Sequence, residues 1–307
     1  MQKRRLGTSG IEVSVVGVGC NNFGRRIHDV AGARAVVDRA IDLGVTLFDT
    51  ADAYGNGTSE SFLGESIGSR RHEVVIATKF GWGSPSGASR RTVMQTVEQS
   101  LKRLRTDYID LYQVHFPDPN TPIEETLRAL DELVQAGKVR QIGCSNFSGA
   151  QVTAALDTSK RLKLAAFVTC QDEYSLLVRG IEKKNVPVMR EHGLTLLPYA
   201  PLAGGFLSGK YLRNKPLPRN ARLAYSSHHA SDVINARNWN LSDRLREFAA
   251  RKGHDMLDIA FGWLLARPFT ASVIAGAMTA EQVDQNVRAG EVSLTADEVA
   301  ELDRITE

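Results

Sequence analysis

The chain has 307 residues, of which 42% are hydrophobic and 24% are charged, and its formal net charge is +3. This balance predicts a folded globular protein, and a charge this small, without long basic blocks, gives no reason to expect nucleic-acid binding. No apolar stretch reaches the length of a membrane span, and the N-terminus lacks the apolar core of a signal peptide. We therefore expect a cytoplasmic protein with no nucleic-acid or membrane partner.

The predicted elements begin with a β-hairpin and then alternate between strands and helices. Gly7-Thr8-Ser9-Gly10 stands between two short runs, which is typical of a hairpin turn. Eight apolar runs follow, each of the length of a buried strand. These predicted strands cover residues 15–19, 46–48, 74–78, 109–114, 139–144, 166–170, 195–198 and 272–275.

Amphipathic helices fill the gaps between these strands. The clearest covers residues 123–136, with apolar residues at helical spacing. We expect Thr121 as its N-cap, Pro122 in its first turn, Glu124 in a capping box and Gly137 as its C′ residue. A last helix follows the final strand, and Thr295 with Glu298 predicts a capping box at its start.

Eight strand–helix units without a linker predict an α/β fold, namely one (β/α)₈ TIM barrel forming a single domain over residues 1–307. The additions to the barrel are the N-terminal hairpin, a long loop after strand 7 at residues 212–240, and the extra C-terminal helix. A doubly wound sheet is the alternative, although no Gly-x-Gly-x-x-Gly motif opens a helix in this sequence.

The cysteines and the metal-ligand residue types predict little chemistry. Cys20, Cys144 and Cys170 lie in or beside apolar runs, which predicts reduced, buried thiols. None has an obvious base beside it, so a catalytic cysteine is not expected. No metal-ligand spacing occurs, and no metal site is expected.

Four polar residues stand at the ends of predicted strands or directly after them: Asp49, Tyr54, Lys79 and His115. Parallel strands in an α/β barrel end at one rim, so these side chains should meet there. Each alone has an ordinary interpretation as a turn, packing, surface or hydrogen-bonding residue. Together a carboxylate, a phenol, an amine and an imidazole can hold and move a proton. Asp52, a second acid in the same turn, is expected to have a turn or surface role.

Five motifs in chain order resemble landmarks of the aldo-keto reductase superfamily. They are residues 48–55, 77–80, 143–147, 171–175 and 199–205. The resemblance extends from about residue 3 to the final helix. It is closest to the bacterial reductases related to potassium-channel β subunits, rather than to the steroid and aldose reductases with shorter loops.

The resemblance implies transfer of a hydride between a nicotinamide cofactor and a small-molecule carbonyl or alcohol substrate. Tyr54 would be the general acid, and Lys79 would lower the pKa of its phenol. Asp49 would hold Lys79 in an ion pair. His115 would orient the carbonyl or assist proton transfer.

The resemblance also implies where the cofactor binds. Ser145, Asn146 and Gln171 correspond to residues that bond the nicotinamide carboxamide, and Tyr199 to the aromatic that stacks on its ring. Cys20 and Asn21 would lie near the nicotinamide ribose. The predicted pyrophosphate contacts are Pro201, Leu202, Gly204 and Gly205. The predicted adenosine contacts are Gly276, Gln282, Gln285 and Asn286.

The adenosine segment departs from the family pattern, because no Arg or Lys stands near Met278, Thr279 or Gln282 to bind a 2′-phosphate. Lys210 or Arg222 could bind it instead. We therefore favour NADPH/NADP+ over NADH, which stays possible.

The substrate pocket is expected to form from the loops at residues 22–28, 80–89, 116–120 and 212–239. Trp82 and Phe116 are its expected apolar walls. Trp239 fits equally well as a pocket wall or as an anchor of the long loop.

Two other functions are compatible with the sequence. A nicotinamide-binding regulatory subunit could keep the fold with little turnover, although the complete set of four residues argues against it. A barrel isomerase or aldolase could use Lys79 to form a Schiff base, which Tyr54 and Asp49 make less favoured.

Overall fold

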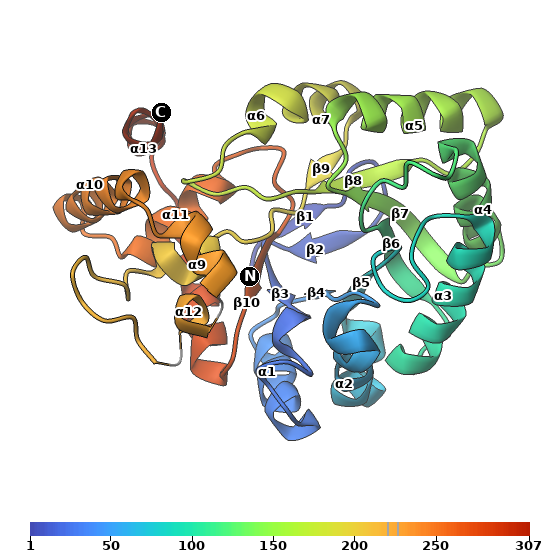
Figure 1. Ribbon diagram of the computed structural model, residues 1–307, viewed down its shortest axis with the longest axis horizontal. Coiled ribbons are helices and arrows are strands. Elements are labelled where there is room, and N and C mark those ends of the chain that lie inside the picture. Colours follow the sequence, from blue (N-terminus) through green and yellow to red (C-terminus); the bar gives the residue numbers. More distant parts are fainter. Residues whose placement is uncertain (220, 226) are drawn as a thin grey trace.

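The computed structural model describes residues 1–219, 221–225 and 227–307, with residues 225 and 227–229 described by their backbone alone. Over these residues, eight parallel strands form one curved sheet surrounded by helices (Figure 1). In sheet order the strands are β10 (Val273–Gly276), β3 (Val16–Gly19), β4 (Leu47–Asp49), β5 (Val75–Phe80), β6 (Ile109–Val114), β7 (Val139–Ser145), β8 (Phe167–Gln171) and β9 (Thr195–Leu196).

Residues just before β10 close the sheet into a barrel. The Leu196 amide donates to the Phe269 carbonyl at 2.7 Å, and the Ala271 amide donates to the Leu196 carbonyl at 2.9 Å. The two edge strands of the sheet are thereby joined, and the predicted (β/α)₈ barrel is confirmed.

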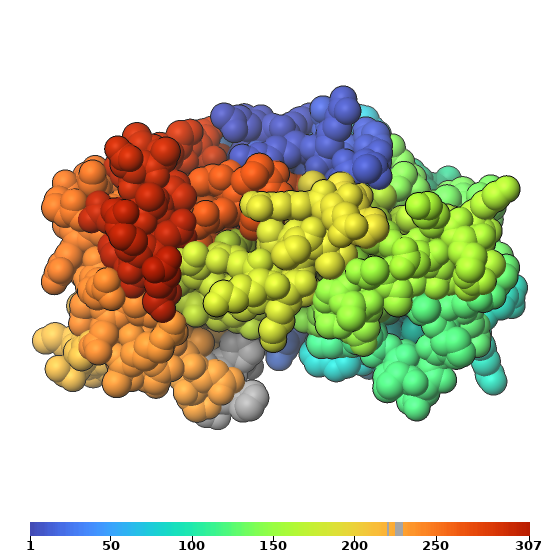
Figure 2. All heavy atoms as spheres, turned by 90° about the horizontal axis from the view of Figure 1, so that it is seen from above, coloured from blue at the N-terminus to red at the C-terminus, as the bar shows by residue number. Residues whose placement is uncertain are grey.

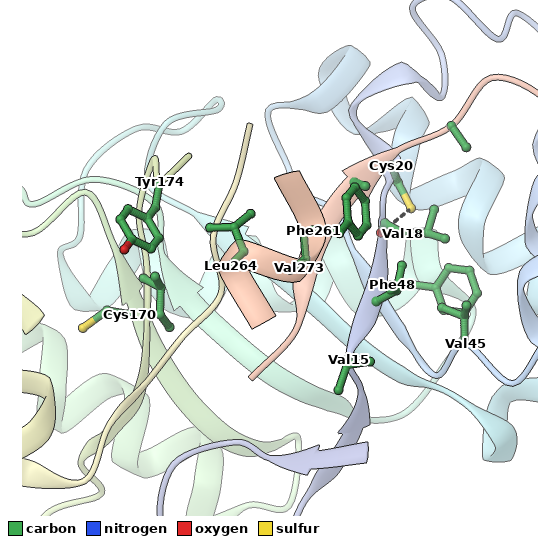
Figure 3. Packing of buried hydrophobic residues seen from close by; sticks show 14 of the residues in the cluster. Val15, Val18, Cys20, Val45, Phe48, Cys170, Tyr174, Phe261, Leu264 and Val273 are labelled. Carbon is green, nitrogen blue, oxygen red and sulfur yellow. Dashed lines mark hydrogen bonds between the residues drawn. The ribbon is translucent and has the colours of Figure 1, made fainter. Parts of the chain in front are cut away.

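Helices follow the strands and cover the outside of the barrel. They are α1 (Val30–Asp42), α2 (Thr58–Ile67), α3 (Arg90–Leu104), α4 (Ile123–Gln135), α5 (Gly149–Leu162), α6 (Ile181–Lys184), α7 (Val186–His192), α11 (Met256–Leu265) and α12 (Ala280–Gly290). Short 3₁₀ turns lie between these elements: η1 (Cys20–Asn22), η2 (Tyr54–Gly57) and η4 (Ala203–Ser208) after strands, and η3 (Gly68–Glu73) between α2 and β5. Figure 3 shows how apolar side chains of β3 and β10 pack near Phe261 and Leu264 of α11.

The predicted helix ends are correct in some places and wrong in one. Gly137, at φ 72°, follows the C-cap of α4 as expected. The predicted capping box is wrong, because Pro122 is the N-cap of α4 and makes no side-chain capping bond. The Thr121 hydroxyl instead donates to the Asp118 carboxylate at 2.7 Å. The Thr295–Glu298 capping box of α13 (Ala296–Thr306) is confirmed.

The N-terminal hairpin covers the end of the barrel where the strands begin. Strands β1 (Lys3–Arg5) and β2 (Glu12–Ser14) pair antiparallel as predicted. The Arg4 guanidinium donates to the Leu265 and Thr270 carbonyls, both at 2.7 Å. At Gly7, which has φ 53°, an added Cβ would lie 2.2 Å from the Val168 carbonyl oxygen, so glycine alone fits there. Figure 2 shows this segment in blue, against the orange and yellow parts of the chain.

The segment at residues 212–240 is more regular than the predicted loop. It contains α8 (Arg222–Tyr225), α9 (Ser227–Val233) and the start of α10 (Ala236–Lys252). The Asn235 side chain caps α10 by accepting from the Asn238 amide at 2.9 Å. Trp239, in the first turn of α10, packs edge-on against Phe206 at 4.8 Å between ring centroids, and thus anchors the segment.

The three cysteines are free thiols buried in the core, as expected. Burial raises the pKa of the Cys20 and Cys144 thiols well above its usual range. In the described part of the chain, no helix is long and apolar enough to cross a bilayer. No group of three or more potential metal-ligating side chains occurs among the described residues either.

Candidate active site

A buried ion pair lies at the end of the barrel where the strands finish. Asp49 ends β4 and Lys79 lies near the end of β5. The Lys79 Nζ lies 2.8 Å from Asp49 Oδ1 and 2.7 Å from Oδ2, and it donates to the Thr50 carbonyl at 3.0 Å. Its distance to the Tyr54 hydroxyl is 3.5 Å. The structure thus brings the predicted carboxylate, amine and phenol into one cluster.

The charges in this cluster set the protonation of Lys79. Burial alone lowers the pKa of the Lys79 amine, but Asp49 and Tyr54 outweigh that effect and raise the pKa above its ordinary value. The amine is therefore an ammonium at neutral pH. A protonated amine is a poor nucleophile, which argues against Lys79 as a Schiff-base former.

The Tyr54 phenol is also protonated at neutral pH. Burial raises the pKa of Tyr54, and the opposing effect of Lys79 is too small to reverse this, in part because Asp49 raises the pKa as well. Lys79 acts in the predicted direction, but the net pKa lies above 10 rather than below it. A protonated phenol is the form that can donate a proton.

His115 follows β6 and lies beside Tyr54. The two ring centroids are 5.8 Å apart, and the Phe116 ring stacks on His115 at 5.2 Å. Burial and then the charge of Lys79 lower the pKa of His115 to about 3, so the imidazole is neutral at physiological pH. Its buried Nδ1 has no hydrogen-bond partner among the described residues.

A chain of hydrogen bonds continues from Asp49 along the ends of β7 and β8. The Gln171 side-chain amide donates to Asp49 Oδ1 at 2.8 Å, and the Ser145 hydroxyl donates to the Gln171 carbonyl at 2.8 Å. The Asn146 amide donates to Ser145 Oγ at 2.9 Å, and the Tyr199 hydroxyl donates to Asn146 Oδ1 at 2.9 Å. Four of the predicted cofactor contacts are therefore joined to the ion pair.

A cavity of about 990 Å³ opens above these groups. Within the described residues, Asp49, Tyr54, His115 and all the predicted cofactor and substrate contacts except Cys20 line it. Lys79 is buried behind the surface of the cavity, and the Cys20 side chain lies in the hydrophobic core, where its thiol faces the Val18 carbonyl.

The segment from Pro201 to Gly205 approaches the cavity in an unusual backbone conformation. Ala200 and Ala203 have φ of 50° and 45°, and Gly204 and Gly205 have φ of 68° and 90°. A Cβ on Gly205 would lie 2.9 Å from Lys210 Nζ. The φ of 90° favours glycine at this position, where the backbone passes close to the Lys210 ammonium.

The segment predicted to bind adenosine lies on the same cavity, between β10 and the first turns of α12. The Met278 amide donates to Gln282 Oε1 at 2.8 Å, and the Thr279 side chain caps α12. Gln285 and Asn286 line the cavity from α12.

Cationic side chains gather on this cavity, and three of them were not predicted from the sequence. Lys210 and Arg222 were predicted, whereas Arg25, Arg26 and Arg219 also line the cavity. Burial and then the charge of Arg26 lower the pKa of Lys210; burial, Arg25 and Arg26 lower the pKa of Arg222. Arg25 and Arg26 could have been predicted to line the cavity, because they stand next to each other in a loop that was expected to border the pocket.

Two exposed aromatics, which were predicted to border a substrate, form an apolar wall of the cavity. Trp82 is 58% exposed and Phe116 is 40% exposed. The Trp82 ring stands edge-on to His115 at 5.0 Å and to Phe116 at 5.4 Å between centroids.

Asp52 lies in a turn, which is one of the two roles expected for it, but it is buried, so the surface role is wrong. It is 7% exposed, and neither carboxylate oxygen has a hydrogen-bond partner among the described residues. Burial and the neighbouring Glu60 raise its pKa from 3.8 to about 7. The folded protein therefore holds a proton here between about pH 4 and pH 7 that the unfolded chain has lost.

This proton predicts a loss of stability as the pH rises through that window. We expect Asp52→Asn to remove up to roughly 3 kcal/mol of the stability loss between pH 5 and pH 8, since about two units of the raised pKa lie in this interval and one unit corresponds to about 1.4 kcal/mol. Thermal unfolding of the wild type and the variant at pH 5 and pH 8 measures the effect. Asp107→Asn, at an exposed position, is the control. The prediction would be contradicted if the wild type and Asp52→Asn changed in stability by the same amount between pH 5 and pH 8.

A parallel barrel whose buried polar cluster opens on a cavity at the C-terminal ends of the strands has the architecture of a (β/α)₈ enzyme. Comparison with known proteins agrees with this class. The sequence matches the Aldo/keto reductase family over residues 15–307.

Three relatives illustrate the range of the matches. The chain is 35% identical over 308 residues to "Probable voltage-gated potassium channel subunit beta" of Arabidopsis thaliana, covering 95% of this chain and 92% of that protein. It is 33% identical over 322 residues to "L-glyceraldehyde 3-phosphate reductase" of Escherichia coli (strain K12), covering 99% and 92%. It is 35% identical over 298 residues to "Aldo-keto reductase YhdN" of Bacillus subtilis (strain 168), covering 92% and 87%. The chain belongs to the aldo/keto reductase family, which confirms the resemblance seen in the sequence.

Proposed function

We propose that this protein is an NADPH-dependent carbonyl reductase, which reduces aldehydes or ketones or oxidises the matching alcohols. The observation that carries the proposal is the Lys79–Asp49 ion pair, placed beside the protonated Tyr54 phenol at the bottom of the cavity. Several relatives are named reductases or oxidoreductases, which agrees with this function.

The hydrogen-bonding groups that line the cavity are suited to those of a nicotinamide dinucleotide. Ser145, Asn146 and Gln171 offer the hydroxyl and amides suited to a carboxamide, and the Tyr199 ring borders the same space. The glycine turn at residues 204–205 and the cations Lys210 and Arg222 suit phosphate groups.

A nicotinamide bound there would supply the hydride, which no protein side chain can provide. Tyr54 donates its proton to the carbonyl oxygen as negative charge develops on that atom. Lys79 stabilises the phenolate that remains, and Asp49 fixes the position of Lys79. The neutral His115 offers a hydrogen bond that orients the carbonyl, and Trp82 and Phe116 exclude water from the apolar side.

The cations on the cavity predict a preference between the two nicotinamide cofactors. Neither Lys210 nor Arg222 has a carboxylate within 4.0 Å among the described residues, so both can meet an additional phosphate. We expect NADPH to bind about tenfold more tightly than NADH, a difference of about 1.4 kcal/mol. Fluorescence quenching gives both dissociation constants, and Lys210→Gln should narrow the difference. Equal or tighter binding of NADH would overturn the preference.

A steady-state screen tests the function itself. Oxidation of NADPH is followed with a panel of aldehydes, ketones, dicarbonyls, quinones and sugars, and turnover of at least one carbonyl class is expected. The second candidate function is a nicotinamide-binding regulatory subunit, which the name of the Arabidopsis relative favours. Tight cofactor binding without turnover of any carbonyl would favour that second function.

A further inference from the structure

The loop between β3 and α1 presents two arginines to the cavity on a rigid turn. The Asn22 carbonyl accepts the amides of Arg25, Arg26 and Ile27 at 3.2, 2.9 and 2.9 Å. Phe23 and Ile27 on either side are buried, at 0% and 5% exposure. Because the backbone is fixed at both ends of the turn, both arginine side chains start from defined positions, and both line the cavity.

Arg25 lies close to the Tyr54 end of the cavity. Its guanidinium donates to Asn21 Oδ1 at 2.9 Å. A hydrogen bond from the Asn21 side chain also lowers the pKa of Tyr54, so the Asn21 amide bridges the arginine and the phenol. Only one side chain therefore separates the Arg25 charge from the group proposed to act as the acid.

The cavity carries an excess of positive charge at this end. Its acidic lining residues are Asp49 and Glu173, and the charge of Asp49 is balanced by Lys79. In the described part of the chain, Arg25 has no carboxylate within 4.0 Å and has Asn21 as its polar partner. Lys210 lies at the glycine turn suited to cofactor phosphates, which leaves the charge of Arg25 for another anion.

We propose that Arg25, together with the adjacent charge of Arg26, makes this cavity selective for carbonyl substrates that carry an anionic group, a carboxylate or a phosphate, away from the reacting carbon. The inference rests on the proposed carbonyl reductase function and names its substrate class. A guanidinium forms paired, charge-assisted hydrogen bonds with either anion. An arginine at the cavity mouth also attracts anions from solution, an effect that salt weakens.

The experiment compares three aldehydes that differ in one substituent, with saturating NADPH. They are 4-carboxybenzaldehyde, 4-formylphenyl phosphate and the neutral methyl 4-formylbenzoate. We expect the wild type to show at least about fivefold higher kcat/KM for an anionic aldehyde than for the ester at low salt, and a smaller ratio at high salt. The two anionic substrates separate a preference for carboxylate from a preference for phosphate.

The variants are Arg25→Gln and the double variant Arg25→Gln/Arg26→Gln, and Arg25→Lys tests the need for the guanidinium fork. Arg34→Gln is the matched control, since Arg34 is exposed on α1 and donates to the Glu65 carbonyl away from the cavity. We expect the double variant to raise KM for the anionic aldehydes about tenfold and to leave kcat/KM for the ester and the dissociation constant of NADPH within about twofold.

Three results would overturn the inference: no anionic preference in the wild type, equal losses for anionic and neutral aldehydes, or a change confined to NADPH binding. The last result would assign the arginines to the cofactor phosphates. Equilibrium binding of 4-hydroxymethylbenzoate and of its methyl ester by calorimetry provides a readout that needs no turnover. Tighter binding of the anion, lost in the double variant, supports the inference even if no aldehyde is reduced, whereas absence of turnover alone counts against the proposed reductase function.

Discussion

Replacing Tyr54 with phenylalanine is expected to lower kcat for aldehyde reduction by about a thousandfold, or about 4 kcal/mol of activation free energy. The substitution removes the hydroxyl that lies 3.5 Å from Lys79 Nζ and keeps the ring that packs edge-on to His115. The proton donor is lost while the shape of the cavity is retained. Steady-state kinetics and NADPH titration of the same variant measure the two effects, and the dissociation constant should change by less than about twofold.

The pH profile of the wild type provides a check on the same assignment. The pKa of Tyr54 is raised above 10 and that of His115 is lowered to about 3, so neither group titrates between pH 5 and pH 8. Reduction should therefore keep a constant kcat across this range and decline only above pH 10, where the phenol loses its proton. A Tyr54→Phe variant that reduces a reactive aldehyde at the parental rate would show that Tyr54 is not the acid.

Replacing Lys79 with methionine is expected to harm both stability and activity. The variant leaves the Asp49 carboxylate buried, with the Gln171 amide as its remaining side-chain donor in the described structure. Breaking a buried pair in this way costs about 3–5 kcal/mol, which lowers the melting temperature by roughly 5–8 °C for a chain of this size. The rate should also fall, because the phenolate formed at Tyr54 loses its ammonium neighbour.

A double variant separates these two consequences. Asp49→Asn/Lys79→Met removes both charges, so most of the lost stability should return while the reductase activity stays low. Arg90→Met is the matched control, because the Arg90–Glu132 pair has the same 2.7 Å separation but is exposed, and its loss should leave the melting temperature nearly unchanged. An unchanged melting temperature in Lys79→Met would rule out the stabilising role of the buried pair.

The sequence predicted the barrel because strands buried on both sides are short, apolar runs. Residues 109–114 were predicted and found as one strand without any change of limits. The meeting of Asp49 and Lys79 was predictable for the same reason, since parallel strands end at one rim. Motif resemblance added residues such as Gln171, whose place beside Asp49 no local pattern reveals.

What the sequence could not predict depends on contacts between distant segments. Thr121 was expected to cap a helix, but its hydroxyl donates a hydrogen bond to the Asp118 carboxylate instead. Asp52 resembled an exposed turn residue, and its burial depends on the packing around Glu60 and on the approach of Gly83, where an added Cβ would lie 2.8 Å from the carboxylate. Arg25 has no local signature either, because its importance comes from the cavity that other loops complete.

The burial of all three thiols makes the protein well suited to site-specific labelling. Maleimides react with exposed thiolates, and Cys20, Cys144 and Cys170 are buried in the folded state. A cysteine introduced at the exposed Lys215, in the segment that precedes α8, would therefore be the single reactive site. A dye attached there would report directly, by its fluorescence, whether the segment changes its surroundings when cofactor is added.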